Sequence, residues 1–131
     1  MKRRLLATIT VTVAGSLATA PAVHADASSL DQDCQSLWAP LADESGMWPS
    51  SYLVVGADID VDQAGAFASD ATEFRQTEWQ TRAGRRVGRQ LARYFQVLAR
   101  ADRYTKGMRN MEQRLIDSRE FQRVANACGV G

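Results

Sequence analysis

The sequence predicts an all-α fold, a small antiparallel bundle of about four helices whose two ends are joined by a disulfide. Three observations lead to this prediction. Residues that favour helices, Ala, Leu, Gln and Arg among them, are abundant after residue 25, and no proline follows Pro49. Apolar residues recur there at intervals of three and four positions. The two cysteines, Cys34 and Cys128, lie near the two ends of that same stretch.

The N-terminal segment has the pattern of a secretory signal. Residues 2–4 are cationic, residues 5–18 form an apolar run, and Val23-His24-Ala25 places small residues where a signal peptidase cleaves. The run is too short and too weakly apolar to be a strong membrane span. We therefore expect residues 1–25 to be a signal peptide and residues 26–131 to be a single secreted helical domain of bacterial origin, in the extracellular space or the cell envelope. A retained N-terminal anchor is the alternative.

We expect Cys34 and Cys128 to form a disulfide. An exported protein meets an oxidising environment in which disulfides persist, and two cysteines allow one intramolecular pairing. The alternative roles of nucleophile or metal ligand are less favoured, because the only histidine, His24, leaves with the predicted signal. A mature chain without histidine also lacks Ser-His-Asp catalysis and the common zinc sites. We predict neither a metal nor a cofactor.

The first helix is expected to begin at a cap formed by Ser28 or Ser29. Its apolar positions have helical spacing and comprise Leu30, Cys34, Leu37, Trp38 and Leu41. Pro40 predicts a kink or a restart of the helix. Residues 46–56 have the composition of a loop. Within it, residues 52–55 are β-prone, and because one isolated run cannot form a sheet we expect a buried extended loop.

Asp60 and Gln63 have the spacing of a capping box, which predicts the start of a second helix. Its expected core face, which leaves Asp70 and Glu73 outside, comprises Val61, Ala64, Phe67, Ala68, Ala71, Phe74 and Trp79. Gly84 is expected to end this helix, and a third helix is expected from about Arg85 to Tyr104. The core face of the third helix comprises Val87, Leu91, Tyr94, Phe95 and Leu98.

The last segment, after a predicted break at Gly107, carries two apolar sets. Met108, Met111 and Leu115 share one face, whereas Phe121, Val124 and Cys128 lie about 130° round from it at 100° per residue. A restart near Ser118, where Asp117 and Glu120 have capping-box spacing, is one interpretation, and a continuous, gently twisted helix is the other. In an up-down-up-down bundle the first helix starts where the fourth ends, which agrees with the predicted disulfide.

The chain is divided by charge. Residues 26–74 contain ten acidic residues and no Lys or Arg, whereas residues 75–131 contain thirteen basic and five acidic residues. Five arginines, Arg82 among them if the third helix reaches back to it, project within about 60° of one another, opposite the apolar face of that helix. They are Arg82, Arg86, Arg89, Arg93 and Arg100. They form either a cationic surface for an anionic partner or the solvated face of an amphipathic helix.

Two further features bear on function. Trp48, in the loop beside Pro49, is the best candidate for an exposed recognition residue. The acids of residues 58–62 alternate as at the start of a calcium loop, but Gln63 and Ser69 stand where Gly and Glu are required. A helix cap with solvated loop acids explains the same residues.

We therefore predict a secreted, non-enzymatic helical protein that binds a protein or an anionic envelope polymer, with nucleic acid a less favoured partner. The predicted binding residues are the five arginines and Trp48. Two alternatives stay open, namely a secreted enzyme that uses carboxylate and arginine chemistry, and a carrier of a small apolar ligand in the bundle core. The loss of histidine and thiol chemistry favours the non-enzymatic interpretation.

Overall fold

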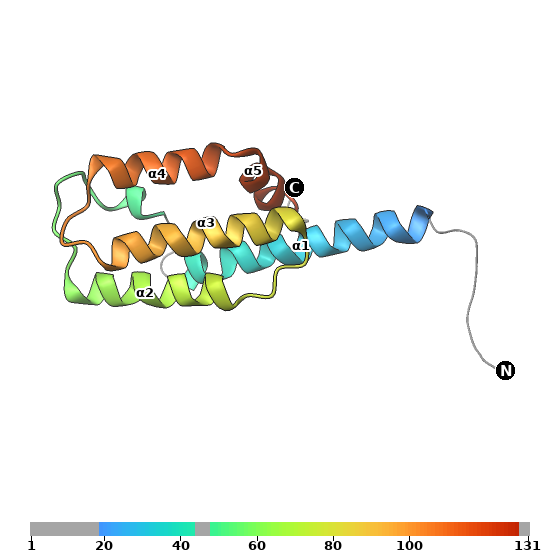
Figure 1. Cartoon of the computed structure of the whole chain (residues 1–131), viewed down its shortest axis with the longest axis horizontal. Helices are drawn as coiled ribbons and strands as arrows, with labels where there is room; N and C mark the ends of the chain where they lie inside the picture. The colour runs from blue at the N-terminus through green and yellow to red at the C-terminus, as the bar shows by residue number, and fades with distance from the viewer. Residues whose placement is uncertain (1–18, 44–47, 129–131) are drawn as a thin grey trace.

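The computed structural model describes residues 19–43 and 48–128, and of residues 19–26, 42 and 43 it describes the backbone alone. This part of the chain is all-α and contains no strand, in agreement with the predicted fold class (Figure 1). Its elements are α1 (Thr19–Asp43), the 3-10 turn η1 (Pro49–Ser51), α2 (Val61–Gln76), α3 (Arg82–Ala99), α4 (Lys106–Asp117) and α5 (Arg119–Ala125). Most of the predicted signal, residues 1–18, lies outside the described residues.

Helix α3 is the central element, because it contacts each of the other four α-helices. Figure 1 shows it running alongside α2, with α4 on its other side. Its predicted core residues are all buried, and they are Val87, Leu91, Tyr94, Phe95 and Leu98. The rings of Phe67 and Phe74 from α2 lie 6.0 and 5.6 Å from that of Phe95. These contacts make the α2–α3 pair the main part of the core.

Helix α1 differs from the prediction at both ends. It begins at Thr19, well before the expected cap at Ser28 or Ser29, and it continues through Pro40 to Asp43 without a restart. Proline removes one backbone donor, but this one lies in the last turn, where few intrahelical bonds follow it. Pro40 is itself buried, so packing compensates for the missing bond.

The prediction that residues 52–55 form a buried loop is wrong for three of the four residues. Leu53 is buried, but Tyr52, Val54 and Val55 are exposed. The backbone beyond them is tied across to the segment before α4, where the Gly56 N–H donates to the Tyr104 carbonyl at 2.7 Å. Tyr52 and Val55 lie in turns at the two sides of Leu53, so a single side chain of this run reaches the core.

The start of α2 follows the prediction, since Asp60 and Gln63 form a complete capping box. The predicted core face is displaced, however. Val61 is 86% exposed and Ala68 is also exposed, whereas Asp70, which we expected outside, is buried. Helix α2 packs mainly on α3, so only the stripe that faces this one neighbour is covered.

Gly84 does not end the second helix, as we had predicted. Helix α2 ends at Gln76, and α3 begins at Arg82 behind an N-cap, Thr81, whose hydroxyl accepts from the Gly84 N–H at 2.9 Å. Trp79, predicted on the second helix, therefore lies in the connection. Gly84 is buried inside α3, and this position requires glycine because an added Cβ would overlap the carboxylate of Asp33 on α1.

The buried carboxylate of Asp33 holds α1 against the start of α3. Its Oδ1 accepts from the Gln80 N–H at 2.7 Å, and its Oδ2 accepts from the Thr81 N–H at 2.9 Å and the Thr81 hydroxyl at 2.6 Å. Asp33 is 1% exposed. A carboxylate at a helix N-terminus satisfies backbone donors that have no partner within the helix.

The end of the chain follows the restart that the two apolar sets indicated. Helix α4 ends at Asp117 and α5 begins at Arg119, with Ser118 between them. The Ser118 hydroxyl, rather than Asp117, accepts from the Phe121 N–H at 3.1 Å and caps α5. The predicted third helix ends five residues early, at Ala99, and α4 starts just before the predicted break at Gly107.

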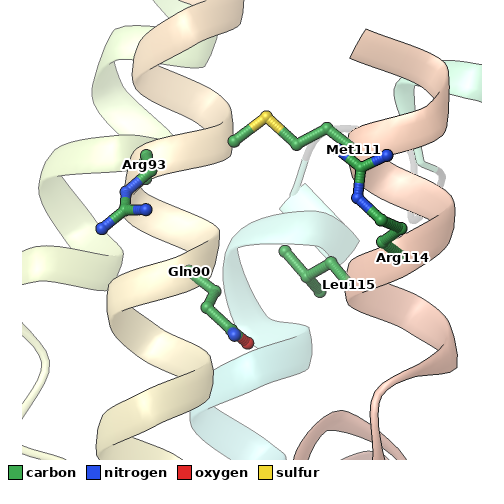
Figure 2. Close-up of a pocket in the computed structure, with 5 residues that line it drawn as sticks. All are labelled: Gln90, Arg93, Met111, Arg114 and Leu115. Atoms are coloured by element: carbon green, nitrogen blue, oxygen red, sulfur yellow. The ribbon is translucent and has the colours of Figure 1, made fainter. Parts of the chain in front are cut away.

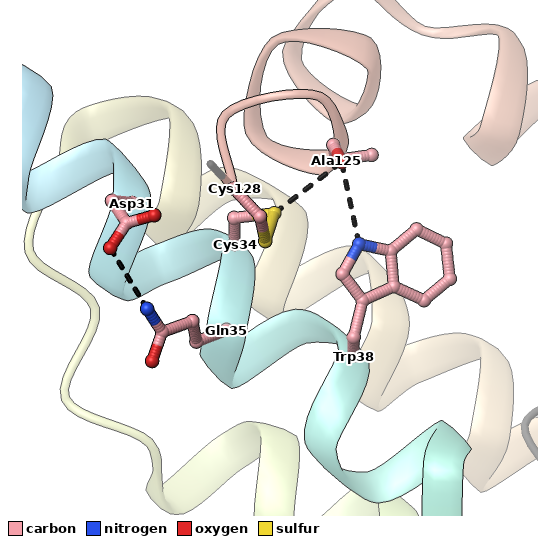
Figure 3. Close-up of a disulfide and its surroundings, with 6 residues drawn as sticks. All are labelled: Asp31, Cys34, Gln35, Trp38, Ala125 and Cys128. Atoms are coloured by element: carbon pink, nitrogen blue, oxygen red, sulfur yellow. Dashed lines mark hydrogen bonds between the residues drawn. A yellow bond between two sulfur atoms is a disulfide. The ribbon is translucent and has the colours of Figure 1, made fainter. Parts of the chain in front are cut away.

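The predicted disulfide is present and joins α1 to Cys128, the third residue after the end of α5. The Cα atoms of Cys34 and Cys128 lie 5.4 Å apart, and 94 positions separate the two residues in the sequence. Figure 3 shows the Ala125 carbonyl beside the bridge, where it accepts from the Trp38 indole N–H at 3.4 Å. Both contacts fix the end of α5 on α1.

Replacement of Cys34 and Cys128 by Ser should lower the free energy of unfolding by about 4–5 kcal/mol, because a loop of this length costs the unfolded chain that much conformational entropy. Urea denaturation of the oxidised protein and of the double variant measures the difference. The reduced wild-type protein is the control and should match the variant. Equal stability of the oxidised and reduced wild type would contradict the prediction.

Asp33→Ala should lower the free energy of unfolding by about 3 kcal/mol, since it leaves two backbone donors and a hydroxyl without their buried charged acceptor. The control is Asp62→Ala, which removes an exposed carboxylate from the first turn of α2 and should cost at most about 1 kcal/mol. Urea denaturation measures both variants. Similar losses for the two would show that Asp33 is not an anchor.

Candidate functional site

All five predicted arginines are exposed on the side of α3 away from its core face. Arg82 opens the helix and Arg100 is its C-cap residue, so the helix extends over the whole predicted set. Thr81 sets the start of the helix, and buried apolar residues fix its rotation about its own axis. The arginines therefore project into solvent from a rigid element.

An open groove of about 450 Å³ lies between α2 and α3. Three of the predicted arginines, Arg89, Arg93 and Arg100, line it together with Arg75 from the last turn of α2. The remaining lining residues are Ala92, Gln96 and Val97. We call this feature the α2/α3 groove.

The α2/α3 groove is a site of positive potential, because four guanidinium groups line it and no acidic residue does. Gln96 helps to position one of them, since the Arg75 Nη2 group donates to Gln96 Oε1 at 3.0 Å. Val97, 37% exposed, gives the groove an apolar element. Guanidinium groups bind carboxylate, phosphate or sulfate through parallel N–H donors, so the groove has the chemistry of an anion site.

Arg82 and Arg86 do not line the groove. Arg86 faces α5, where its Nε lies 3.8 Å from Glu120 Oε2. Both side chains of this pair are more than a third exposed, and a pair of that kind contributes little to stability. The structure thus divides the five predicted arginines into a group of three and a group of two.

Sequence reasoning missed Arg75, which completes the groove. It is the first basic residue after the acidic part of the chain, but nothing in the helical pattern of α3 includes it. Its place depends on how α2 packs on α3, and this packing follows from the tertiary contacts of Phe67 and Phe74.

Trp48 is half-buried, and its ring centroid lies 6.3 Å from Trp38 and 5.7 Å from Phe121. This aromatic cluster packs on the hydrophobic core and joins Trp48, the N-cap residue of η1, to α1 and α5. Trp48 does not line the α2/α3 groove. The structure therefore gives it a packing contact, and its role in recognition stays a prediction.

A second cleft, smaller than the first, lies between α3 and α4 and has a volume of about 230 Å³. Figure 2 shows its lining residues, which are Gln90, Arg93, Met111, Arg114 and Leu115. We call it the α3/α4 cleft. Arg93 lines both hollows, whose other residues are different.

A buried polar cluster surrounds Glu112 of α4, which is 2% exposed. Its Oε1 accepts from the Tyr94 hydroxyl at 2.5 Å, and its Oε2 accepts from the Ser50 hydroxyl. Sequence reasoning placed Tyr94 in the core but missed its partner, because an acid in an Arg-rich helix has the pattern of a surface residue. The cluster fastens η1 to α3 and α4.

Burial raises the pKa of Tyr94 well above its ordinary value, and the hydrogen bond and negative charge of Glu112 raise it further. The phenol therefore stays protonated as a hydrogen-bond donor in the folded protein at pH values where an exposed tyrosine ionises. Because Tyr94 and Glu112 are buried and bonded to each other, this cluster has the features of a structural network.

Two negative findings concern the described residues. They contain no group of three or more His, Cys, Asp or Glu side chains arranged to hold a metal ion. Within the same residues, no helix combines the length and the apolar character that a membrane span requires.

Comparisons of the chain with models of protein families, with curated proteins and with solved structures found no match. The interpretation of the site therefore depends on its own geometry and charge.

In the variant Tyr94→Phe, the free energy of unfolding should fall less steeply with pH above about pH 10 than in the wild type. The folded-state pKa of Tyr94 lies above the unfolded value of about 10, so its contribution is complete below pH 10 and declines by up to about 1.4 kcal/mol per pH unit above it. Urea denaturation between pH 8 and about 11.5 measures the slope. Tyr52→Phe, at an exposed tyrosine, is the control and should keep the wild-type slope. Identical slopes for all three proteins would contradict the assignment.

Proposed function

We propose that the protein is a secreted, non-enzymatic binding protein that engages an anionic partner, a polymer of the cell envelope or an acidic protein, through the α2/α3 groove. The observation that carries the proposal is the convergence of Arg75, Arg89, Arg93 and Arg100 on one open groove without a lining carboxylate. The solvated-face interpretation explains why arginines lie on this side of α3. It does not by itself require a matching arginine from α2.

The shape of the groove supports an extended partner. Residues 89 and 100 are eleven positions apart on one helix, which corresponds to about 16 Å at 1.5 Å per residue. A single small anion contacts one or two guanidinium groups, whereas a chain of anionic groups contacts all four. Each exposed contact contributes less than about 1 kcal/mol, so useful affinity needs several together.

Export is part of the proposal. It is supported by the cationic and apolar pattern of residues 1–25 and by the disulfide between Cys34 and Cys128, a bond typical of oxidising compartments. We further propose that the helices form an antiparallel four-helix bundle in which α4 and α5 together take the place of the fourth helix. Its support is the order of the helices along the chain and the short connections between them. The enzyme and carrier interpretations stay predictions.

The triple variant Arg75→Gln, Arg89→Gln, Arg100→Gln should bind envelope fragments of the producing bacterium about tenfold more weakly, because three exposed charge contacts together contribute about 1.5 kcal/mol. Co-sedimentation at about 25 and 150 mM NaCl measures the bound fraction, and wild-type binding should fall with added salt.

The matched control is Arg85→Gln, Lys106→Gln, Arg119→Gln, which removes three exposed cations that do not line the groove. Its binding should stay within about twofold of wild type, since the net charge changes equally but the groove does not. If the two triple variants lose binding equally, the net charge of the protein, and not the groove, determines binding. Wild-type binding that is absent at low salt would overturn the proposal.

A further inference from the structure

The α3/α4 cleft contains a buried polar atom that has no partner. Gln90 projects from α3 toward α4, and its Oε1 is buried and accepts no hydrogen bond from the described residues. A buried amide oxygen without a hydrogen-bond donor destabilises the folded protein, so its presence needs a physical reason. A ligand that supplies the missing donor would provide it.

The lining of the cleft defines the chemistry of such a ligand. Arg114 projects from α4 beside Met111 and gives that side of the cleft a positive charge (Figure 2). Arg93 of α3 also lines the cleft, but its guanidinium points away from α4. Met111 and Leu115 provide the apolar part, and the thioether chain of Met111 is unbranched and adapts its shape readily. The Gln90 amide offers both an acceptor and two N–H donors, and rotation about its last bond costs little.

We propose that the α3/α4 cleft binds an N-acylated apolar amino acid with a free carboxylate, either as the C-terminal residue of a peptide or as a free molecule. The carboxylate pairs with the Arg114 guanidinium, and the amide N–H next to it donates to Gln90 Oε1. The apolar side chain packs on Met111 and Leu115. A free carboxylate, an adjacent N–H and an apolar group are the three features that the lining complements.

The volume of the cleft agrees with a ligand of this size. An apolar protein cavity of about 150 Å³ accommodates benzene, and the α3/α4 cleft, at about 230 Å³, is moderately larger. An aliphatic side chain of four carbons with its carboxylate fits such a space. The acyl group then points to the open side, from which a peptide chain continues into solvent.

This inference does not depend on the proposed function. Gln90, Met111, Arg114 and Leu115 do not line the α2/α3 groove, and Arg93 is the one shared residue. Substitutions at Gln90 and Arg114 therefore test the cleft alone. The arginine variants that test the groove leave the cleft unchanged.

The first experiment uses N-acetyl-L-leucine as the probe and follows the amide resonances of α3 and α4 by NMR titration of the full exported protein. Saturable shifts confined to residues around the cleft are expected. N-acetyl-L-leucinamide, which keeps the N–H and the side chain but lacks the charge, should bind at least tenfold more weakly. Absence of saturable shifts with N-acetyl-L-leucine, or equal affinity for the two probes, would overturn the proposal.

The second experiment compares two substitutions in the cleft. Gln90→Met keeps the length of the side chain but removes the amide, so it should weaken binding at least tenfold while the midpoint of urea denaturation stays equal or rises. Arg114→Gln should weaken binding to a similar extent, and Arg119→Gln, an exposed cation on α5, is the matched control with unchanged affinity. Wild-type affinity in both cleft variants would refute the assigned contacts.

A third titration distinguishes the two sources of the ligand. The peptide Ala-Ala-Ala-Leu with a free C-terminus presents the same group at the end of a chain. Binding at least as tight as that of N-acetyl-L-leucine identifies a peptide C-terminus as the natural ligand. Clearly weaker binding identifies a free acylated amino acid, because the cleft then accepts the group but excludes the chain.

Discussion

The position of α3 depends on a buried carboxylate that it does not itself supply. Asp33 of α1 accepts hydrogen bonds from the backbone of Gln80 and Thr81, and Gly84 leaves room for this approach. Because α3 contacts every other α-helix, the contact that fixes its start also fixes the surface on which α2, α4 and α5 pack. The next residue, Cys34, ties the same turn of α1 to the end of the chain. One turn of α1 therefore holds both the beginning of the central helix and the C-terminal segment.

Two of the buried acids, Asp33 and Glu112, are satisfied by neutral donors. Asp33 accepts from backbone and hydroxyl groups, and Glu112 accepts from the hydroxyls of Ser50 and Tyr94. Neither uses an arginine in the contacts described above, although arginine is the commonest basic residue of the chain. A buried carboxylate that is satisfied by neutral donors leaves the cations at the surface. The three α3 arginines that line the α2/α3 groove, Arg89, Arg93 and Arg100, therefore remain available for partners outside the chain.

The two hollows beside α3 share a rigid wall but differ in chemistry. The α2/α3 groove is open and long, and its four guanidinium groups suit an extended anion. The α3/α4 cleft is smaller and combines cations with an amide and apolar groups, which suits one terminal residue. Arg93 lies between them. Since the helix that separates the hollows is held at its start by Asp33, their spacing is set before any partner binds, and this lowers the entropic cost of binding.

The sequence by itself determined the all-α class, the disulfide between Cys34 and Cys128, the capping box at Asp60, the core face of α3 and its outward row of arginines. The helical features follow from the spacing of residues that are close in the sequence. The disulfide follows from the presence of two cysteines, which allow one intramolecular pairing. Tertiary structure alone decided that Gly84 admits Asp33 instead of ending a helix, that Val61 is exposed while Asp70 is buried, and that Arg75 joins three of the five predicted arginines. These features depend on which helix packs against which, and on the angle and depth of that contact. Such contacts join residues far apart in the chain, so helical periodicity carries no record of them.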